Sequence, residues 1–200
     1  LVAIMIAIPL GIWSSTKKNS SIDLVATGAA VLGKAMPNFW LGIMLILLFS
    51  VTLDMLPVSG RGSFSHLILP AITLGTGIAA EMTRLIRSSM LETLSQDYIR
   101  TAKSKGLRTG IVVYKHAFRN TLVPVVTIIA LQTSTLIGGT LITETVFAWP
   151  GIGQLLIQAV NTRDMAIVQA CVMVIAFFVI VMNLIADLLY QVLDPRIRYK

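Results

Sequence analysis

The sequence predicts an all-α, polytopic membrane protein with about five membrane-spanning helices. Of its 200 residues, 56% are hydrophobic and 12% are charged, and the mean hydropathy is +0.83. A soluble domain carries about twice that share of charged residues, because its surface faces water. Residues 121–142 hold no charge, and residues 166–189 hold a single acid, Asp187. Each stretch matches the roughly 20 apolar residues that cross a hydrocarbon core.

The apolar segments are placed in order along the chain. We expect spans at residues 1–13 (partial), 36–56, 67–88, 120–142 and 166–190. The first is shorter than a span and shows neither a basic stretch nor a small-residue cleavage site ahead of it, so we expect a fragment that begins inside a membrane helix. Residues 21–35 end before Pro37 and carry charges at both ends, which indicates an interfacial or re-entrant helix on the inner side.

The distribution of basic residues sets the predicted topology. Of the 16 Lys and Arg residues, only Arg61 and Arg163 fall on one side of these spans, and the other 14 fall on the opposite side. This asymmetry is typical of membrane proteins, and the crowded side is the cytoplasmic one. The net charge of +7 therefore reports topology, and it does not indicate a nucleic-acid partner. We expect the loop at about 89–119 and the C-terminus to be cytoplasmic.

The most informative stretch is this cytoplasmic loop. Leu91, Leu94, Tyr98 and Ala102 recur at helical spacing and predict one face of a helix. Gly106 ends that helix, and Thr109 is a candidate N-cap for a second one. The sequence thus predicts a basic helical hairpin, which on these grounds alone either lies on anionic lipid or docks on a protein.

The outer side carries two loops. Residues 57–66 are short, polar and rich in Gly and Ser, which indicates a turn. Residues 149–153 read Trp-Pro-Gly-Ile-Gly and predict a non-helical outer loop, because three helix breakers in five residues do not continue a span in lipid. This loop is either a plain external turn or an outer gate. The gate candidates are Glu144, Trp149, Pro150, Gly151 and Gly153.

Catalytic and cofactor sites are not indicated. Cys171 is the only cysteine, and neither His66 nor His116 has further ligands at metal-binding spacing. A phosphate-binding glycine loop is also missing from the sequence, so no nucleotide site is predicted in this chain. The acids in the predicted spans lie near span ends, where Glu81 is placed to pair with Arg84.

Several runs of residues resemble one family of membrane proteins, the permeases of binding-protein-dependent ABC importers, and within it the first permease of the dipeptide, oligopeptide and nickel group. The runs that carry the resemblance are residues 97–107 (Asp-Tyr-Ile-Arg-Thr-Ala-Lys-Ser-Lys-Gly-Leu), 116–120, 123–126, 36–42 (Met-Pro-Asn-Phe-Trp-Leu-Gly), 87–92, 144–153 and 194–198 (Asp-Pro-Arg-Ile-Arg). They extend over nearly the whole chain. Arg100-Thr101 stands where importers generally have Glu-Ala, and the peptide and nickel branch shares that departure.

The resemblance implies a type I permease fold, with residues 1–200 as a single transmembrane domain truncated at its N-terminus. It implies a bacterial inner-membrane subunit that is not an enzyme and binds no cofactor itself. Its partners would be a second permease, two cytoplasmic ATPases that bind ATP, and an extracytoplasmic solute-binding protein. The ATPase-coupling residues would be those of the cytoplasmic hairpin: Tyr98, Arg100, Thr101, Ala102, Lys103, Gly106 and Leu107.

The solute is left open among dipeptides, oligopeptides, glutathione-like peptides, nickel or a nickel chelate, and opine-like compounds. Two other functions remain as alternatives. An ion-coupled secondary carrier commonly needs carboxylates or broken helices near the membrane midplane, and the predicted spans carry no midplane acid. A membrane-embedded hydrolase could draw on the Ser, His and Asp residues that are present, but the predicted topology places His66 and His116 on opposite sides of the membrane.

Overall fold

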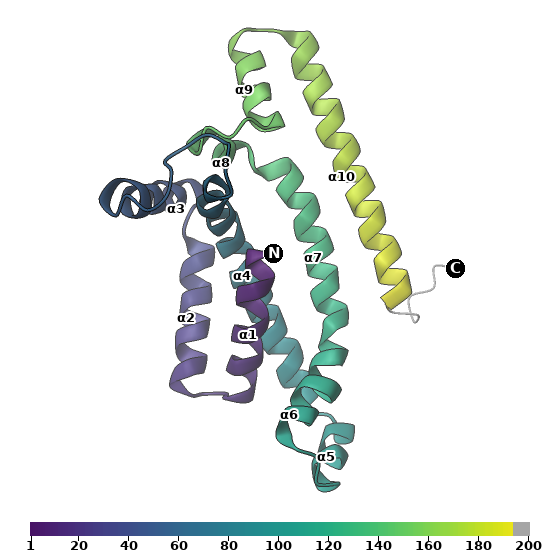
Figure 1. Ribbon diagram of the computed structural model, residues 1–200. Coiled ribbons are helices and arrows are strands. Elements are labelled where there is room, and N and C mark those ends of the chain that lie inside the picture. The colour runs from purple at the N-terminus through teal and green to yellow at the C-terminus, as the bar shows by residue number, and fades with distance from the viewer. Residues whose placement is uncertain (194–200) are drawn as a thin grey trace. The chain divides into compact units, whose positions relative to one another are not determined.

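The computed structural model describes residues 1–193, with side chains described for residues 1–133, 136 and 140–188. Within that part of the chain every regular element is a helix (Figure 1). The predicted all-α class is confirmed. The chain divides into two compact units, one formed by residues 1–35, 77–129 and 188–200 and the other by residues 36–76 and 130–187. The predicted single permease domain over 1–200 stays a prediction.

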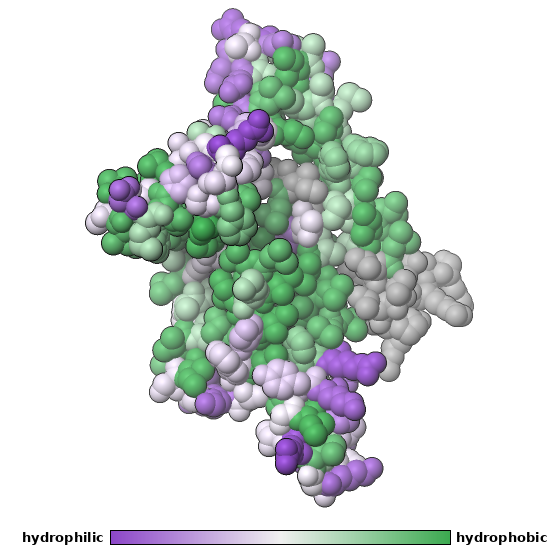
Figure 2. All heavy atoms as spheres, in the orientation of Figure 1, coloured by the Kyte–Doolittle hydropathy of each residue, from purple (hydrophilic) through white to green (hydrophobic). Residues whose placement is uncertain are grey.

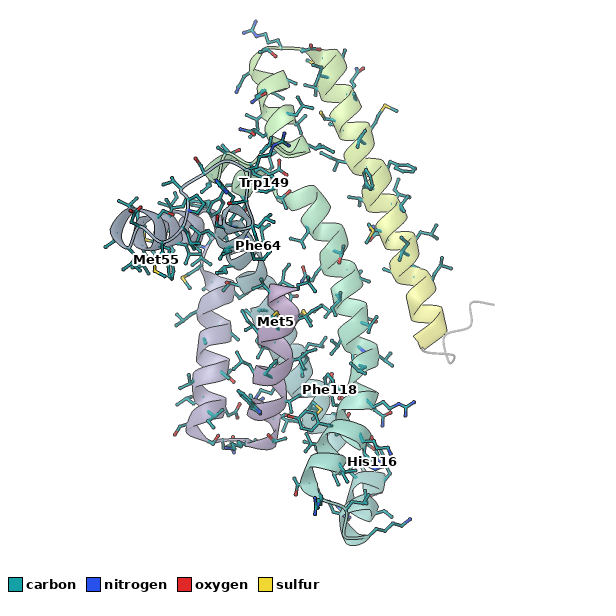
Figure 3. All side chains as sticks on the ribbon, viewed as in Figure 1. Met5, Met55, Phe64, His116, Phe118 and Trp149 are labelled. Atoms are coloured by element: carbon teal, nitrogen blue, oxygen red, sulfur yellow. The ribbon has the colours of Figure 1, made fainter. Side chains whose placement is uncertain are left out.

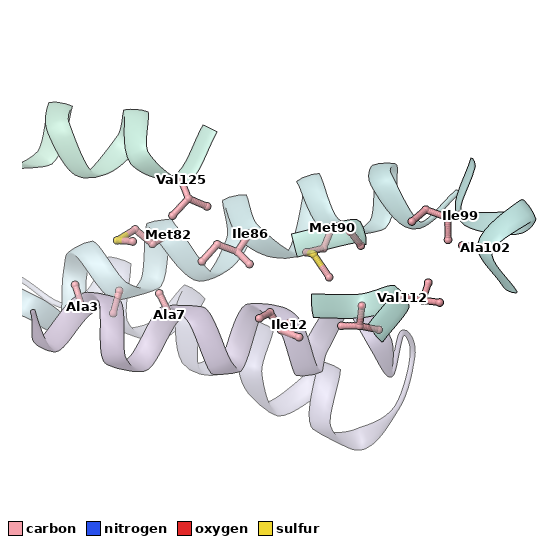
Figure 4. Close-up of a cluster of buried hydrophobic side chains, with 13 residues drawn as sticks. Ala3, Ala7, Ile12, Met82, Ile86, Met90, Ile99, Ala102, Val112 and Val125 are labelled. Carbon is pink, nitrogen blue, oxygen red and sulfur yellow. The ribbon is translucent and has the colours of Figure 1, made fainter. Parts of the chain in front are cut away.

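Unit 1 is a helical bundle with an apolar core. It contains α1 (Val2–Thr16), α2 (Ser21–Ala35), the second part of α4 (Ser65–Leu94), α5 (Asp97–Ser104), α6 (Thr109–Ile111), the π-helix η2 (Val112–Phe118) and the first part of α7 (Arg119–Gly139). Figure 4 shows the buried side chains that α1 and α4 contribute, among them Ile12, Ile86 and Met90. A Cβ on Gly11 would lie 2.6 Å from Ile86 Cγ2, so glycine lets α1 approach α4 closely.

Helix α2 occupies the segment predicted as an interfacial or re-entrant helix, and that placement in the membrane stays a prediction. It packs against α1 in a hairpin, joined by residues 17–20 (Figure 1). Two ion pairs tie it to α4: Asp23 near its start binds Arg87, and Lys34 near its end binds Glu81 at 2.9 Å. The sequence prediction paired Glu81 with Arg84 instead. Together with Asn38–Thr52, α2 is apolar and long enough for one broken span or a re-entrant pair.

Unit 2 contains the remaining helices. These are α3 (Asn38–Leu45), the π-helix η1 (Ile46–Thr52), the first part of α4, the later part of α7, α8 (Leu141–Val146), α9 (Ile152–Asn161) and α10 (Met165–Leu193) up to residue 187. Helix α3 packs on α8, where a Cβ on Gly42 would lie 3.2 Å from the Phe147 ring. The backbone N–H of Gly60 also donates to the carbonyl of Phe147 at 3.0 Å.

Helices occupy all five predicted span positions, with shifted ends. Among the described helices, α10 alone is long and apolar enough to cross a membrane by itself, over Met165–Leu188. Only 6% of its most apolar stretch is buried inside the protein. Side chains such as Met173 and Ile180 face outward there, which suits lipid rather than water. Figure 2 shows hydrophobic residues over much of the visible surface, with hydrophilic residues gathered over α5 and α6 and again around the turn between α9 and α10.

Four predicted boundaries are corrected. The segment predicted as a span over 36–56 ends at Thr52, and its second half is π-helical. The outer turn predicted over 57–66 stops at Phe64, because α4 begins at Ser65. The span predicted over 120–142 ends at Gly139, and residues 141–146 form the separate helix α8. Helix α6 begins at Thr109 with Arg108 as its N-cap, so Thr109 is not the cap.

Candidate functional site

The first candidate site is the basic hairpin, residues 97–118, which comprises α5, α6 and η2. Helix α5 buries one face, with Ile99 fully covered and Ala102 7% exposed. These two side chains belong to the same core cluster as Val112, Val113 and Ala117 of η2. Because α5 also packs directly on η2, the hairpin is fixed to the bundle by apolar contact.

The outward face of the basic hairpin carries cations with aromatic and aliphatic side chains between them. Tyr98 is 43% exposed, and Leu107, Ile111 and Tyr114 are also exposed. The exposed cations around them are Arg100, Lys103, Lys105, Arg108 and Lys115. Arg100 lies 3.7 Å from Asp97 in an ion pair that is open to solvent on both sides. Such a pair contributes little to stability, so these cations are available to a partner surface.

Leu91 and Leu94 do not lie on one helix with Tyr98 and Ala102, although the helical spacing predicted a single face. The chain breaks after Leu94, and α5 starts anew at Asp97, so the periodicity does not carry across the turn. Instead the Tyr98 hydroxyl accepts a 2.7 Å hydrogen bond from the Asn120 side-chain amide. That amide also donates to the carbonyl of His116 at 3.1 Å, so Asn120 ties the start of α7 to both α5 and η2.

Gly106 turns the chain between α5 and α6, as predicted. Its φ is +74°, in the left-handed region that glycine adopts without a Cβ penalty. The N–H of Leu107 donates to the carbonyl of Ala102 at 3.4 Å, and the N–H of Gly106 donates to Lys103 at 3.0 Å. These two bonds form a Schellman motif with Gly106 at the C′ position, which satisfies the last carbonyls of α5.

The second candidate site is the Glu144 loop, residues 140–154, in unit 2. The sequence predicted Trp149–Gly153 as non-helical, but only Trp149–Gly151 is, and Ile152 and Gly153 begin α9. The Glu144 carboxylate accepts a 3.0 Å bond from the N–H of Gln154 and a 2.9 Å bond from the Thr140 hydroxyl. Glu144 therefore caps the first turn of α9 from ten residues away, where the helix dipole favours a negative charge.

The two glycines of this loop leave room for that carboxylate. A Cβ on Gly151 would collide with the Glu144 carboxyl group. A Cβ on Gly153 would lie 2.8 Å from Leu141 Cα and 2.9 Å from Glu144 Oε2. Trp149, labelled in Figure 3, is partly buried, and its backbone N–H donates to the backbone carbonyl of Glu144 at 2.8 Å. Pro150 is exposed, and no contact of its side chain fixes a role.

A cavity of about 330 Å³ opens between the Glu144 loop and the start of α4, and we call it the α4 pocket. One wall is apolar and comes from α4, between Leu67 and Leu74. The opposite wall carries Thr143, Glu144 and Trp149. All of these residues belong to unit 2, so the α4 pocket lies within one compact unit.

Sequence reasoning missed the network around Asp23. Its carboxylate accepts two bonds from Arg87, at 2.6 and 2.8 Å, and one from the Ser14 hydroxyl at 2.6 Å. It also accepts from the N–H of Asn19 at 2.9 Å. Asp23 is 4% exposed, so this bidentate pair joins α1, α2 and α4 inside the bundle. The only signal in the sequence was an acid at the start of an apolar helix.

The comparisons with known proteins show the family of this chain. Residues 7–199 match the family described as the binding-protein-dependent transport system inner membrane component. The dipeptide transport system permease protein DppB of Escherichia coli strain K12 is 44% identical over 99% of this chain and 68% of its own length. This chain belongs to that family.

Other relatives agree. The oligopeptide transport system permease protein AppB of Bacillus subtilis strain 168 is 43% identical over the whole of this chain and 66% of its own length. The glutathione transport system permease protein GsiC of Pectobacterium atrosepticum is 43% identical over 99% of this chain and 65% of its own length. A chain of the inward-facing MetNI methionine ABC transporter has a TM-score of 0.81 at 16% identity, covering 96% of this chain and 88% of that one.

This permease is therefore an inner-membrane component of an ABC importer and not an enzyme. Its fold is that of an ABC importer permease. The family decides against the ion-coupled carrier and the membrane hydrolase, which the sequence alone left as alternatives. Within the described residues, no group of three or more His, Cys, Asp or Glu side chains is placed to hold a metal ion. The predicted motif at residues 194–198 lies outside the described part of the chain.

Proposed function

We propose that this permease forms part of the membrane path of an ATP-driven importer of short peptides. The observation that carries the proposal is the 43–44% identity, over nearly the whole chain, to permeases named for dipeptide, oligopeptide and glutathione transport. The permease pairs with a second, different permease, and a solute-binding protein delivers the peptide from outside. Two cytoplasmic ATPases bind and hydrolyse ATP, so this subunit needs no cofactor.

The basic hairpin is the part of the permease that docks on an ATPase. Its exposed face presents Tyr98, Leu107 and Tyr114 among five cations, and aromatic side chains with surrounding charge are characteristic of protein interfaces. A hairpin that only lies on anionic lipid needs the cations but does not need a hydrogen bond that fixes the Tyr98 side chain. The hydrogen bond from Asn120 to Tyr98 holds that side chain in place before a partner arrives.

The buried face of the basic hairpin passes movement to the spans. Ile99 and Ala102 belong to one packed cluster with Ile86 and Met90 of α4 and with Ile12 of α1. Close-packed interiors deform little, so a displacement of α5 moves the helices that it contacts. ATP-driven closure of the ATPases would thus tilt α1 and α4, and the path would alternate between outward-open and inward-open arrangements.

The Glu144 loop is proposed as the outer gate. Its capped helix and close glycine contacts make it a compact, well-defined segment rather than a loose connection. A plain external turn remains the competing role, and it needs none of these contacts.

Uptake in reconstituted vesicles tests the proposed function. The permease, its partner permease, both ATPases and the binding protein are assembled with ATP inside, and uptake of labelled dialanine is measured. Uptake that requires both ATP and binding protein supports the proposal. Uptake of labelled nickel without peptide uptake would move the permease to the nickel branch. Peptide uptake driven by an ion gradient without ATP would contradict the importer mechanism.

A further inference from the structure

The α4 pocket has no assigned role, and we propose that it binds the α-ammonium end of a short peptide during passage through the permease. This inference rests on the proposed function, because it concerns the solute of that same path. It goes beyond the gate proposal, since it assigns a ligand group to a named carboxylate. The observations that carry it are the cavity, the chemistry of its two walls, and the acceptor positions that remain open on the Glu144 carboxylate.

The size of the α4 pocket fits a small solute. Ligand sites in proteins are usually mostly apolar clefts of about 300–1,000 Å³ with a few polar groups that orient the ligand. The α4 pocket, at about 330 Å³, lies at the small end of that range. Its α4 wall includes Leu67, Pro70 and Ala71, against which small aliphatic side chains pack without specific recognition.

The opposite wall supplies the polar groups. Glu144 is the one charged side chain that lines the described α4 pocket, and Trp149 adds an aromatic surface beside it. A carboxylate attracts a cation, and the face of an indole ring stabilises one as well. An acidic ligand would gain nothing from this wall. The arrangement therefore selects an ammonium group, and a short peptide carries one at its N-terminus.

Glu144 keeps hydrogen-bonding capacity while it caps α9. Each carboxylate oxygen accepts one bond, Oε1 from the Thr140 hydroxyl and Oε2 from the N–H of Gln154. A carboxylate has about four acceptor positions, so about two remain for a ligand. The cap also fixes the orientation of the carboxylate, and a group held in place loses less entropy when a ligand binds.

The experiment uses cysteine protection in the assembled importer, in vesicles without binding protein. Cys171 is replaced by Ser, and Leu67→Cys is introduced in the α4 pocket. Val58→Cys is the matched control, because Val58 is 49% exposed, Leu67 is 43% exposed, and Val58 does not line the cavity. The rate of modification by N-ethylmaleimide is measured with saturating dialanine, with N-acetyl-dialanine, and without peptide.

We expect dialanine to slow modification at position 67 but not at position 58, and N-acetyl-dialanine to have no such effect. Glu144→Gln keeps an acceptor for the N–H of Gln154 but lacks the charge. In this variant we expect the dialanine concentration that gives half-maximal protection to rise about tenfold, the order expected for one charge-assisted hydrogen bond. If Glu144→Gln fails to assemble, Ala71→Leu narrows the cavity from the other wall and should also reduce protection.

The inference is overturned by equal protection with N-acetyl-dialanine, or by full protection in Glu144→Gln or in Ala71→Leu. It is also overturned if dialanine gives no protection while the complete importer takes up dialanine normally. That last result would leave the proposed function standing. If the parent importer shows no ATP-dependent uptake of dialanine, the proposed function is contradicted, whatever the result of the cysteine experiment.

Discussion

Gly106 allows a direct test of whether the basic hairpin couples the permease to its ATPases. Its φ of +74° forms the C′ position of the Schellman motif that ends α5. A Cβ at this position would meet no atom within 4 Å, so Gly106→Val introduces no clash at its Cβ. The substitution acts only through the backbone, because a β-branched residue strongly disfavours positive φ.

The magnitude follows from that conformational cost. The left-handed region costs a residue with a Cβ about 1–2 kcal/mol. This cost lowers the ratio of formed to unformed turn by about 5- to 30-fold. The free energy involved is small compared with that of membrane insertion, but the change in ratio is large for a docking surface. We expect Gly106→Val to insert and assemble normally while uptake falls and ATP hydrolysis no longer responds to loaded binding protein.

The assay measures dialanine uptake and ATPase activity in reconstituted vesicles, with subunit stoichiometry checked by pull-down. Gly110→Val is the matched control: Gly110 lies in the same hairpin, a Cβ there also meets nothing within 4 Å, and its φ is not positive. It should retain the parent activities. Gly106→Asn should retain more activity than Gly106→Val, because asparagine tolerates the left-handed region.

Two outcomes refute the reasoning. If Gly106→Val transports at the parent rate with all subunits bound, the turn is not the coupling point, and a hairpin that lies on lipid replaces the docking surface. If Gly110→Val loses coupling as completely as Gly106→Val, added bulk anywhere in the hairpin is harmful. The conformation of the turn would then not explain the effect.

Three further predictions follow from the remaining contacts. Gly151→Val displaces the carboxylate that caps α9, so uptake should fall if this loop is a gate, whereas parent-level uptake at normal expression would favour a plain turn. Asp23→Asn removes the charge that Arg87 binds and should lower the free energy of unfolding by about 3 kcal/mol, measured as a lower thermal midpoint in detergent. Adding Arg87→Met should restore part of that loss, and an unchanged midpoint in the single variant would contradict a stabilising pair. In a chain whose native cysteine is replaced, Ser104→Cys should react with impermeant reagents only from the cytoplasmic side and Ser63→Cys only from outside, and labelling of both from one face would contradict the topology.

The features that the sequence predicted correctly depend on local rules. Apolar length places helices at every predicted span, because a helix in lipid must satisfy its own backbone. The turn at Gly106 was predictable because a glycine after a periodic segment, with Lys103 and Lys105 before it, is the usual way a helix ends. Such signals depend only on residues within a few positions of each other.

The features that the sequence did not predict depend on packing between distant segments. Asp23 and Arg87 are 64 residues apart, and an isolated acid at the start of an apolar helix suggests contact with headgroups when its partner is unknown. Lys34 gave the same impression, although it binds Glu81 on α4. Hydropathy assigns a depth to each charge but gives no information on which helix faces it, so the contacts of α2 with α1 and α4 were not predicted.

The end of α8 shows why a turn can escape sequence analysis even when its backbone matches a recognisable one. The N–H of Trp149 donates to the carbonyl of Glu144 at 2.8 Å, and the N–H of Ala148 donates to Thr145 at 3.2 Å. This is the same Schellman pattern as at Gly106, but Ala148 holds the C′ position with a φ of +47°. An alanine there gives no turn signal, which is why the predicted loop began at Trp149. The turn brings Glu144 over the first turn of α9, and a positive φ that surrounding contacts sustain is characteristic of functional sites. The same backbone motif therefore forms in two ways: at the basic hairpin Gly106 adopts the positive φ without a steric cost, and beside the α4 pocket surrounding contacts hold Ala148 in it.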